Sequence, residues 1–457
     1  MAHGLYHHYM TMRRASGFAV GYNRRDVSAR IQARDPQKLL SMPETEINAM
    51  TLGPYGVGRI DGKTVMVPNA APGDLLEVAI RSERRDYAIA RIERIIRPGA
   101  VRREPPCRFL PRCGGCDWQQ IDYPAQVALK AELIAAEFRH VPGIEIDPKG
   151  LVEAAPAEFG YRSRTRFKIG AGGRVGFHEA GSNSIVEIDR CMVAAAPERI
   201  PVALAAALDR RCSEIEVVSD GGGEVLVANL AKAPGNAEVT RARRVIAGDG
   251  LIRGIVLRGG GVRQVVGDAR IAIELEAGCV LEVDADLFTQ VNRAQNLKLV
   301  AAVTEMAAVR DGMAVLDLFC GAGNFSLPLA RRGARVTGVD ADALAIAGAQ
   351  HNAARMNLKE TQFIAMKAAE MARFLDRARY RPELVIIDPP RTGAADLMEP
   401  VARLRPRAVI YISCDATTLV RDLHSLCASG YEIGRLRVFD FFPNTHHAEL
   451  AVHVLLT

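Results

Sequence analysis

The sequence is poor in lysine, tryptophan and long apolar segments. Of its 457 residues, 59 are Lys or Arg, and only nine of these are Lys. No run reaches the ~20 apolar residues that a membrane-spanning helix needs, so we expect a soluble protein that does not cross a membrane. Hydrophobic residues at 49% and charged residues at 25% are typical of globular proteins. This balance excludes a disordered or collagen-like chain.

The basic residues are therefore mostly arginine, and the formal net charge is +6. Arginine binds phosphate through two hydrogen bonds and stacks on bases, which is compatible with nucleic-acid binding. A GC-rich genome would produce the same excess of arginine, so composition alone leaves both explanations open. The length favours two or three domains.

The cysteines indicate a metal centre. No secretory signal precedes residue 42, so we expect a cytoplasmic protein whose nine cysteines stay reduced. Three of them, Cys107, Cys113 and Cys116, form a C-x5-C-x2-C pattern around two glycines. A structural zinc or iron–sulfur site needs a fourth ligand, for which Cys191 is the best candidate because it follows a strand-like segment. The spacing does not decide between iron–sulfur and zinc.

Three regions with different patterns precede residue 281. Residues 1–43 lack periodicity and are expected to form a basic, disordered tail. Residues 44–98 alternate short apolar strands with Gly, Pro and Asp turns, which is typical of a small OB-like β-barrel of four or five strands. Residues 99–280 combine a helix from Tyr123 to about His140, strands, and one Ala-rich helix near 197–209, and predict an α+β central domain. The barrel would carry a basic rim of Arg81, Arg84, Arg85 and Arg91.

Basic side chains also alternate in one predicted strand of the central region. Strand periodicity puts Arg162, Arg164, Arg166 and Lys168 on one face. Since like charges on one face repel each other, we expect RNA phosphates there. The alternative is a solvated edge strand.

Residues 281–457 predict a doubly wound α/β domain. Four short apolar segments, at 315–320, 336–340, 384–388 and 408–413, are typical of buried parallel strands, and helices separate them. The first strand leads into a turn with Gly321 and Gly323, and the second ends in Asp340, where a carboxylate can hold ribose hydroxyls. The sequence has neither G-x-G-x-x-G nor a Walker motif here. These absences favour S-adenosylmethionine over a dinucleotide or a nucleoside triphosphate.

Two further sites near the C-terminus carry reactive side chains. Cys414 follows the last parallel strand, beside the expected cofactor cleft, and is a candidate nucleophile. A buried structural thiol is the commoner role for a lone cysteine. His446, His447 and Glu449 lie close together in the sequence, and alone such a group is more often surface decoration.

Together these motifs resemble the class I RNA 5-methyluridine methyltransferases, the family of the tRNA and 23S rRNA uracil-C5 enzymes. The resemblance spans about residues 44–457. It rests on Phe288-Thr289-Gln290-Val291-Asn292, on 317–325, on Asp388-Pro389-Pro390-Arg391, on Ser413-Cys414 and on His446-His447-Ala448-Glu449. It implies a class I methyltransferase domain at 281–457 and a TRAM RNA-binding module at 44–98. It also implies a [4Fe-4S] site in the central domain with the ligands Cys107, Cys113, Cys116 and Cys191.

The resemblance further implies a role for each site residue. Cys414 would be the nucleophile that adds to uracil C6, and Glu449 the base that removes the C5 proton after methylation. A cofactor-contacting Asn of the family is expected near 367, where this chain has Lys367. The remaining contacts to S-adenosylmethionine would come from Gln290, Phe319, Asn324, Asp340 and Asp388.

The expected substrate is RNA, with 23S rRNA favoured over tRNA, and the expected state is a monomer. One alternative is an RNA cytosine-C5 methyltransferase, which uses the same thiolate chemistry. Another is a non-catalytic RNA-binding or redox-sensing iron–sulfur protein, which would need no nucleophile and base.

Overall fold

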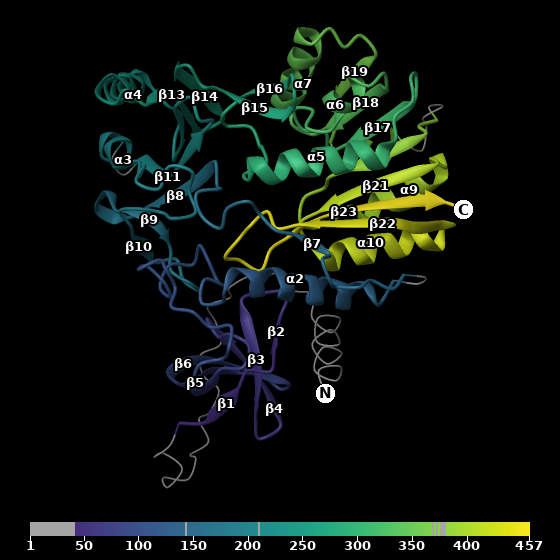
Figure 1. Ribbon diagram of the computed structural model, residues 1–457. Helices are drawn as coiled ribbons and strands as arrows, with labels where there is room; N and C mark the ends of the chain where they lie inside the picture. Colours follow the sequence, from purple (N-terminus) through teal and green to yellow (C-terminus); the bar gives the residue numbers. More distant parts are fainter. Residues whose placement is uncertain (1–41, 142–143, 209–210, 368–369, 372, 375–380) are drawn as a thin grey trace. The chain divides into compact units, whose positions relative to one another are not determined.

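The computed structural model describes residues 42–457 except 142–143, 209–210, 368–369, 372 and 375–380 (Figure 1). The predicted tail at 1–43 lies outside this part, apart from its last two residues. The chain divides into two compact units. The first unit comprises the described residues up to Pro106 together with Asp117–Ala125. The second unit comprises Cys107–Cys116 and Gln126–Thr457.

The first unit is built on one six-stranded sheet. Its strand order is β1-β5-β6-β4-β3-β2, and its core contains apolar side chains such as Val67, Leu76 and Val78. The fully buried Asp74 accepts a hydrogen bond from Arg102 Nε at 2.8 Å and so joins the sheet to the following segment. The sequence predicted four or five strands here, one or two fewer than the structure has. The strands are β1 (Glu44–Glu46), β2 (Ala49–Met50), β3 (Tyr55–Ile60), β4 (Lys63–Pro68), β5 (Leu75–Glu83) and β6 (Tyr87–Arg97).

The second unit contains a seven-stranded sheet and, from Gln126 onward, most of a helix. Helix α2 (Tyr123–Phe138) confirms the helix expected there. The sheet has the order β10-β9-β8-β11-β12-β13-β14. Its strands are β8 (Arg164–Ile169), β9 (Val175–His178), β10 (Ile185–Glu187), β11 (Cys212–Ser219), β12 (Glu224–Leu230), β13 (Ile252–Gly259) and β14 (Val262–Gly267).

The prediction of a single helix between 159 and 280 is wrong. The Ala-rich helix is present as α3 (Val202–Leu208), but α4 (Asn236–Gly248) lies on the same sheet. Its many arginines masked its apolar stripe of Val239, Ala242 and Ile246, which has helical spacing and packs on the core.

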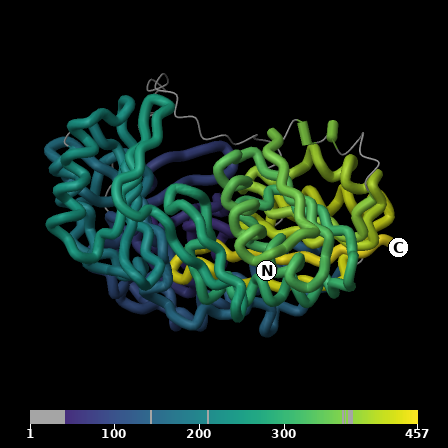
Figure 2. The backbone as a smooth tube through the Cα atoms, turned by 90° about the horizontal axis from the view of Figure 1, so that it is seen from above, coloured from purple at the N-terminus to yellow at the C-terminus, as the bar shows by residue number. Residues whose placement is uncertain are grey.

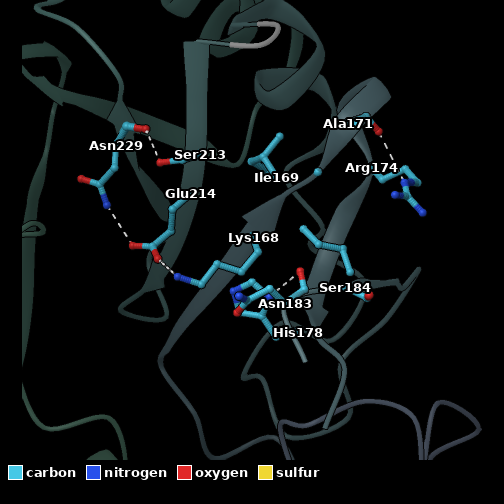
Figure 3. A pocket seen from close by; sticks show the side chains of 12 residues that line it. Lys168, Ile169, Ala171, Arg174, His178, Asn183, Ser184, Ser213, Glu214 and Asn229 are labelled. Atoms are coloured by element: carbon cyan, nitrogen blue, oxygen red, sulfur yellow. Dashed lines mark hydrogen bonds and ion pairs between the residues drawn. The ribbon is translucent and has the colours of Figure 1, made fainter. Parts of the chain in front are cut away.

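The prediction of a phosphate-binding face on β8 is also wrong. Arg164 is buried and donates to Glu216 at 2.7 Å and to the carbonyl oxygens of Ala285 and Leu287. Strand β11 pairs with β8 so that Glu214 lies opposite Lys168 and pairs with it. Figure 3 shows this ion pair at the wall of a hollow of about 500 Å³. The charges of this strand are therefore met by carboxylates of the neighbouring strand, which sequence periodicity could not reveal.

The C-terminal part is an eight-stranded sheet with helices on both faces. Its order is β19-β18-β17-β20-β21-β23-β22-β7, with parallel pairing from β19 to β21 and β23 antiparallel to β21 and β22. All four predicted parallel strands are confirmed, and β19 is additional. The strands are β7 (Val152–Glu153), β17 (Ala314–Leu318), β18 (Arg335–Asp340), β19 (Thr361–Ala365), β20 (Leu384–Ile387), β21 (Ala408–Ser413), β22 (Tyr431–Phe439) and β23 (Glu449–Leu456).

The helices complete the doubly wound arrangement. Figure 1 shows α5 (Arg293–Ala307) on one side of β21–β23 and α10 (Ala416–Ala428) on the other. The central strands β17, β20 and β21 are buried on both faces, which explains their mostly apolar sequences. Helices α6 (Ser326–Ala330), α7 (Ala343–Arg355) and α9 (Ala395–Leu404) and the hairpin β15 (Arg270–Glu276) and β16 (Cys279–Asp284) complete the described elements. No helix in the described ranges has the length and apolar character to span a bilayer.

Candidate active site

Three carboxylates meet at the carboxyl ends of the parallel strands. Asp317 lies in β17, Asp340 ends β18 and Asp388 follows β20. They are close enough that the charges of Asp340 and Asp388 raise the pKa of Asp317. This is the edge of an open α/β sheet where ligands bind.

The turn after β17 is fixed by one of these carboxylates. Asp340 Oδ2 accepts from the backbone N–H of Gly321 at 2.9 Å, and Oδ1 accepts from that of Asp342 at 2.8 Å. Phe319 has a φ of 64°, and Gly323 has a φ of 101° with a wall formed by Leu327. The left-handed backbone explains why glycine is needed in this turn. Its amides and Asp340 form a polar cradle beside the sheet.

Helix α5 connects two of the predicted cofactor residues, Gln290 and Asn324, to the turn after β17. Asn324 exchanges two side-chain amide hydrogen bonds with Asn296 of α5, at 2.9 and 3.1 Å. Gln290 is half-buried and comes two residues before Asn292, whose side chain caps α5. The start of α5 therefore connects the Gln290 segment to the Gly321 turn.

Among the described residues, no positive charge is found to lower the pKa of Asp317 or Asp388. Burial raises the pKa of Asp317 to about 7, with further contributions from Asp388 and Asp340. Burial and then the charge of Asp340 raise the pKa of Asp388 to about 7 as well. Asp317 Oδ1 is buried and has no hydrogen-bond partner among the described residues. A ligand with positive charge fits this site, because it would relieve the repulsion among the carboxylates.

Cys414 and Glu449 lie opposite each other on two neighbouring strands. Ser413, the last residue of β21, pairs with Leu450 of β23, and this register brings the flanking residues Cys414 and Glu449 close enough to interact electrostatically. Burial and then the charge of Glu449 raise the pKa of Cys414 to about 12, while Arg391 lowers it. Burial and then Asp388 raise the pKa of Glu449 well above its usual range, and Arg391 lowers it. The structure thus brings together a thiol, a carboxyl group and a cation.

The two histidines beside this pair are in contact. The ring centroids of His446 and His447 are 3.9 Å apart, and Phe442 lies edge-on to His447. Burial and then His446 lower the pKa of His447 to about 3. His447 is therefore neutral near neutral pH and adds no positive charge next to Glu449.

Several known proteins are similar to this chain in sequence and in architecture. The family model described as tRNA (Uracil-5-)-methyltransferase matches residues 277–457. The 23S rRNA (uracil(1939)-C(5))-methyltransferase RlmD of Pectobacterium atrosepticum is 30% identical over 90% of this chain and 94% of its own length. The RlmD of Edwardsiella ictaluri is 32% identical over 90% of this chain and 95% of its length. This chain belongs to the family of RNA uracil-C5 methyltransferases.

A solved structure of another protein has the same fold as this chain. The tRNA (uracil-54, C5)-methyltransferase of Pyrococcus abyssi, crystallised with S-adenosyl-L-homocysteine, is 24% identical with a TM-score of 0.71. It covers 90% of this chain and 100% of the archaeal chain. The family and the class I methyltransferase fold expected from the sequence are confirmed.

Sequence reasoning missed a buried network in this methyltransferase. Asp422 of α10 is fully buried and accepts from Tyr411 Oη at 2.6 Å and from the backbone N–H of Ala394 at 2.7 Å. Tyr411 lies three residues before Cys414, and Ala394 three residues after Arg391. Asp422 therefore joins the segments that carry the thiol and the cation. The signal was present, because Asp422 falls on the apolar face of α10 defined by Leu419, Leu423 and Leu426.

The expected metal ligands gather only loosely. In the part of the chain that the structure describes, no group of three or more His, Cys, Asp or Glu side chains is arranged to hold a metal ion as it stands. Cys113 and Cys191 are nevertheless close enough to interact electrostatically. Burial and, to a lesser degree, the charge of Cys107 raise the pKa of both thiols. Burial raises the pKa of Cys113 to about 11, whereas the Gly115 backbone amide lowers it. Thiols are the right chemical groups to bind a metal centre as thiolates. The described side chains are not arranged around a common point where a metal ion could bind.

Proposed function

We propose that this chain methylates C5 of a uridine in RNA, with Cys414 as the nucleophile and Glu449 as the base. The observation that carries the proposal is the opposition of a thiol and a buried carboxyl group at the ends of β21 and β23. Uracil C5 is a weak nucleophile by itself. The Cys414 thiolate would add to C6, and the electron pair of the C5–C6 double bond would then be available at C5.

Glu449 suits the second half of the reaction. After C5 has taken the methyl group it still carries its proton. Glu449 would remove that proton, the electrons of the C–H bond would restore the C5–C6 double bond, and the bond from C6 to sulfur would break. A carboxylate whose pKa is raised by burial is a stronger base than one in water, which is the property this step needs.

Arg391 supports the first half of the reaction, the addition of the Cys414 thiolate to C6. Its charge lowers the pKa of Cys414 and of Glu449. A cation near both groups favours the thiolate and would also offset the charge that develops on the uracil ring. Burial and Glu449 outweigh this effect in the free protein, where the pKa of Cys414 is raised to about 12.

The carboxylate edge would hold S-adenosylmethionine, which supplies an electrophilic methyl group on a positively charged sulfur. This placement is supported because no described residue offsets the negative charge of Asp317 and Asp388. Asp340 would bind the ribose hydroxyls, as carboxylates at this strand position do. Gln290, Phe319 and Asn324 line the turn and the start of α5 and would provide the remaining contacts.

RNA contacts would come from the first unit and from an exposed aromatic ring. We propose that β1–β6 form a TRAM-like RNA-binding module, since Arg81, Arg84 and Arg85 are exposed around the β5–β6 turn. Arg91 of the expected rim is instead paired with Glu93. Phe288 is 75% exposed, two residues before Gln290, and offers a surface on which a base can stack. The names of the two similar RlmD proteins give 23S rRNA as their substrate, which favours 23S rRNA as the substrate of this chain.

We further propose that Cys107, Cys113, Cys116 and Cys191 hold a [4Fe-4S] cluster. The mutual influence of Cys113, Cys107 and Cys191 supports this, as do the backbone amides of Val193 and Ala194 beside Cys191. Such amides stabilise thiolate ligands of clusters. The cluster would be structural, because the chemistry needs no electron transfer. Monomeric state and cytoplasmic localisation stay predictions.

The proposal is tested by nucleoside mass spectrometry after incubation of the purified protein with S-adenosylmethionine and unmodified RNA. The account predicts 5-methyluridine in a 23S rRNA transcript and little or none in a tRNA transcript. Methylated tRNA alone would move the substrate to tRNA, 5-methylcytidine would favour the cytosine-C5 alternative, and the absence of any methylated nucleoside would contradict the proposal.

A further inference from the structure

The segment just before Glu449 is anchored at every one of five consecutive residues. The 440–444 loop joins β22 to the His446-His447-Ala448-Glu449 motif, and it extends from the sheet toward the segment 126–161 (Figures 1 and 2). Asp440, Phe441 and Asn444 are fully buried. A loop that connects two antiparallel strands is ordinarily exposed, so its burial calls for an explanation.

The strongest anchor is an ion pair between α2 and this loop. Lys130 Nζ donates to Asp440 Oδ1 at 2.6 Å and to the carbonyl oxygen of Phe442 at 3.2 Å. The side chains of Lys130 and Asp440 are 1% and 0% exposed. A buried pair adds little net stability over an apolar contact of the same size, but it fixes one geometry strictly, since a misplaced charge is costly.

The second anchor is an amide clamp one turn earlier on α2. The Gln126 side chain accepts from the backbone N–H of Asn444 at 2.8 Å and donates to Asn444 Oδ1 at 3.3 Å. Asn444 Nδ2 in turn donates to the carbonyl oxygen of Glu158 at 3.1 Å. Asn444 has a φ of 69°, a left-handed conformation that asparagine and glycine adopt more readily than other residues.

The remaining anchors complete the set. Tyr161 Oη donates to the carbonyl oxygen of Pro443 at 3.1 Å. At the start of α5, Asn292 donates to the carbonyl oxygen of Phe441 at 3.2 Å and Gln295 to that of Asp440 at 3.0 Å. Gln126, Lys130 and Tyr161 all lie outside residues 277–457, the part that the family model matches.

We infer that Lys130, Gln126 and Asn444 are positioning residues that hold Glu449 against the C5 proton of the substrate. The inference rests on the proposed role of Glu449. Glu449 begins β23 opposite Phe439, the residue directly before the 440–444 loop, whereas Cys414 follows β21, whose Tyr411 donates to Asp422 of α10. The anchors of the loop therefore act on the base more directly than on the nucleophile. Loosening the loop therefore slows proton removal while the thiolate still adds to C6.

The two steps can be counted separately in a single turnover, with the protein in excess over the RNA. The substrate carries tritium at uridine C5, and the methyl group of S-adenosylmethionine carries carbon-14. In the wild type one tritium is released for each methyl group transferred. A variant with a misplaced base transfers the methyl group first and releases tritium late, so the covalent protein–RNA adduct accumulates and survives denaturing electrophoresis.

The variants are Asn444→Gly, Lys130→Met and Gln126→Ala. Glycine accepts the positive φ of position 444 and removes only the side-chain clamp, so Asn444→Gly keeps the fold even if Lys130→Met does not. Lys298→Met is the matched control, since Lys298 forms a half-exposed ion pair with Glu153 on the same unit. We expect the anchor variants to lower the rate of tritium release about 10- to 100-fold, the loss typical of a misplaced catalytic group, with methyl transfer changed less.

The outcomes separate the inference from the proposed function. Glu449→Gln must accumulate the adduct, and if it does not, the role of Glu449 fails. If Glu449→Gln accumulates the adduct but Asn444→Gly and Gln126→Ala release tritium and transfer methyl in the wild-type ratio, the positioning inference is overturned. An equal loss of both rates also overturns it, because that result would indicate a purely structural role.

Discussion

Ser413 at the end of β21 is paired with Leu450 of β23, and this register brings the flanking Cys414 and Glu449 close enough to interact electrostatically. The thiol comes from the end of a buried strand and the carboxyl group from the start of its neighbour. Their separation in sequence exceeds thirty residues, yet the sheet register fixes their opposition. The chemistry of this chain depends on that register, and the following predictions test its consequences.

Replacing the nucleophile abolishes turnover. Cys414→Ala removes the atom that adds to C6, so methyl transfer to RNA falls roughly 10³-fold or more. Filter-bound radioactivity from labelled S-adenosylmethionine measures the rate. Cys427→Ala, a half-exposed cysteine at the end of α10, is the control and keeps wild-type activity. Equal activity of both variants would remove Cys414 from the mechanism.

Asp340 controls cofactor affinity. Asp340→Asn loses one of the two acceptors that hold the Gly321 turn and weakens binding of S-adenosyl-L-homocysteine about 10- to 100-fold, as expected for a charge-assisted hydrogen bond. Isothermal titration calorimetry measures the affinity. Asp311→Asn, in the exposed segment before β17, leaves it unchanged. A wild-type affinity in Asp340→Asn would place the cofactor elsewhere.

Stability of the cofactor-free protein falls as the pH rises. Burial raises the pKa of Asp317 and Asp388 to about 7, above the value near 4 of the unfolded chain. The folded state therefore binds more protons between these values, and the stabilising contribution present below pH 4 is lost as the pH passes 7. Thermal unfolding from pH 5 to pH 8 should show a falling midpoint, with a shallower slope for Asp317→Asn. A midpoint that rises over this range would contradict the burial of these groups as acids.

Arg164 stabilises the fold and does not bind RNA. Arg164→Ala removes the buried partner of Glu216, which keeps only the longer contact to Arg166 at 3.5 Å, and costs about 3–5 kcal/mol of unfolding free energy. Arg166→Ala, at a 57% exposed side chain on the same strand, costs under about 1 kcal/mol. Urea denaturation compares the two variants. Similar losses in both would mean that Arg164 is solvated.

Local patterns were enough to predict the catalytic sheet. Its strands are apolar on both faces and end in Asp340, Asp388 and Cys414, and the structure confirms the strands and brings these ends together. The same rule failed for β8. Alternation correctly indicates which side chains share a face, but the carboxylates of β11 that neutralise Lys168 depend on the pairing of two strands about 45 residues apart.

The anchoring of the 440–444 loop was also beyond local patterns. Lys130 lies in an ordinary amphipathic helix, and its partner Asp440 is about 310 residues away. A lysine on a predicted helix is usually solvated, and only the three-dimensional packing shows that this one is buried. Long-range polar pairs of this kind leave no periodic signal in the sequence.

The covalent bond between Cys414 and uracil C6 can be trapped with RNA that contains 5-fluorouridine. Fluorine at C5 cannot be removed as a proton, so methylation proceeds and release does not. Mass spectrometry of the digested complex should find a methylated fluorouridine attached to the peptide that contains Cys414, and no adduct in Cys414→Ala. No adduct with the wild-type protein, or an adduct at another cysteine, would contradict the account.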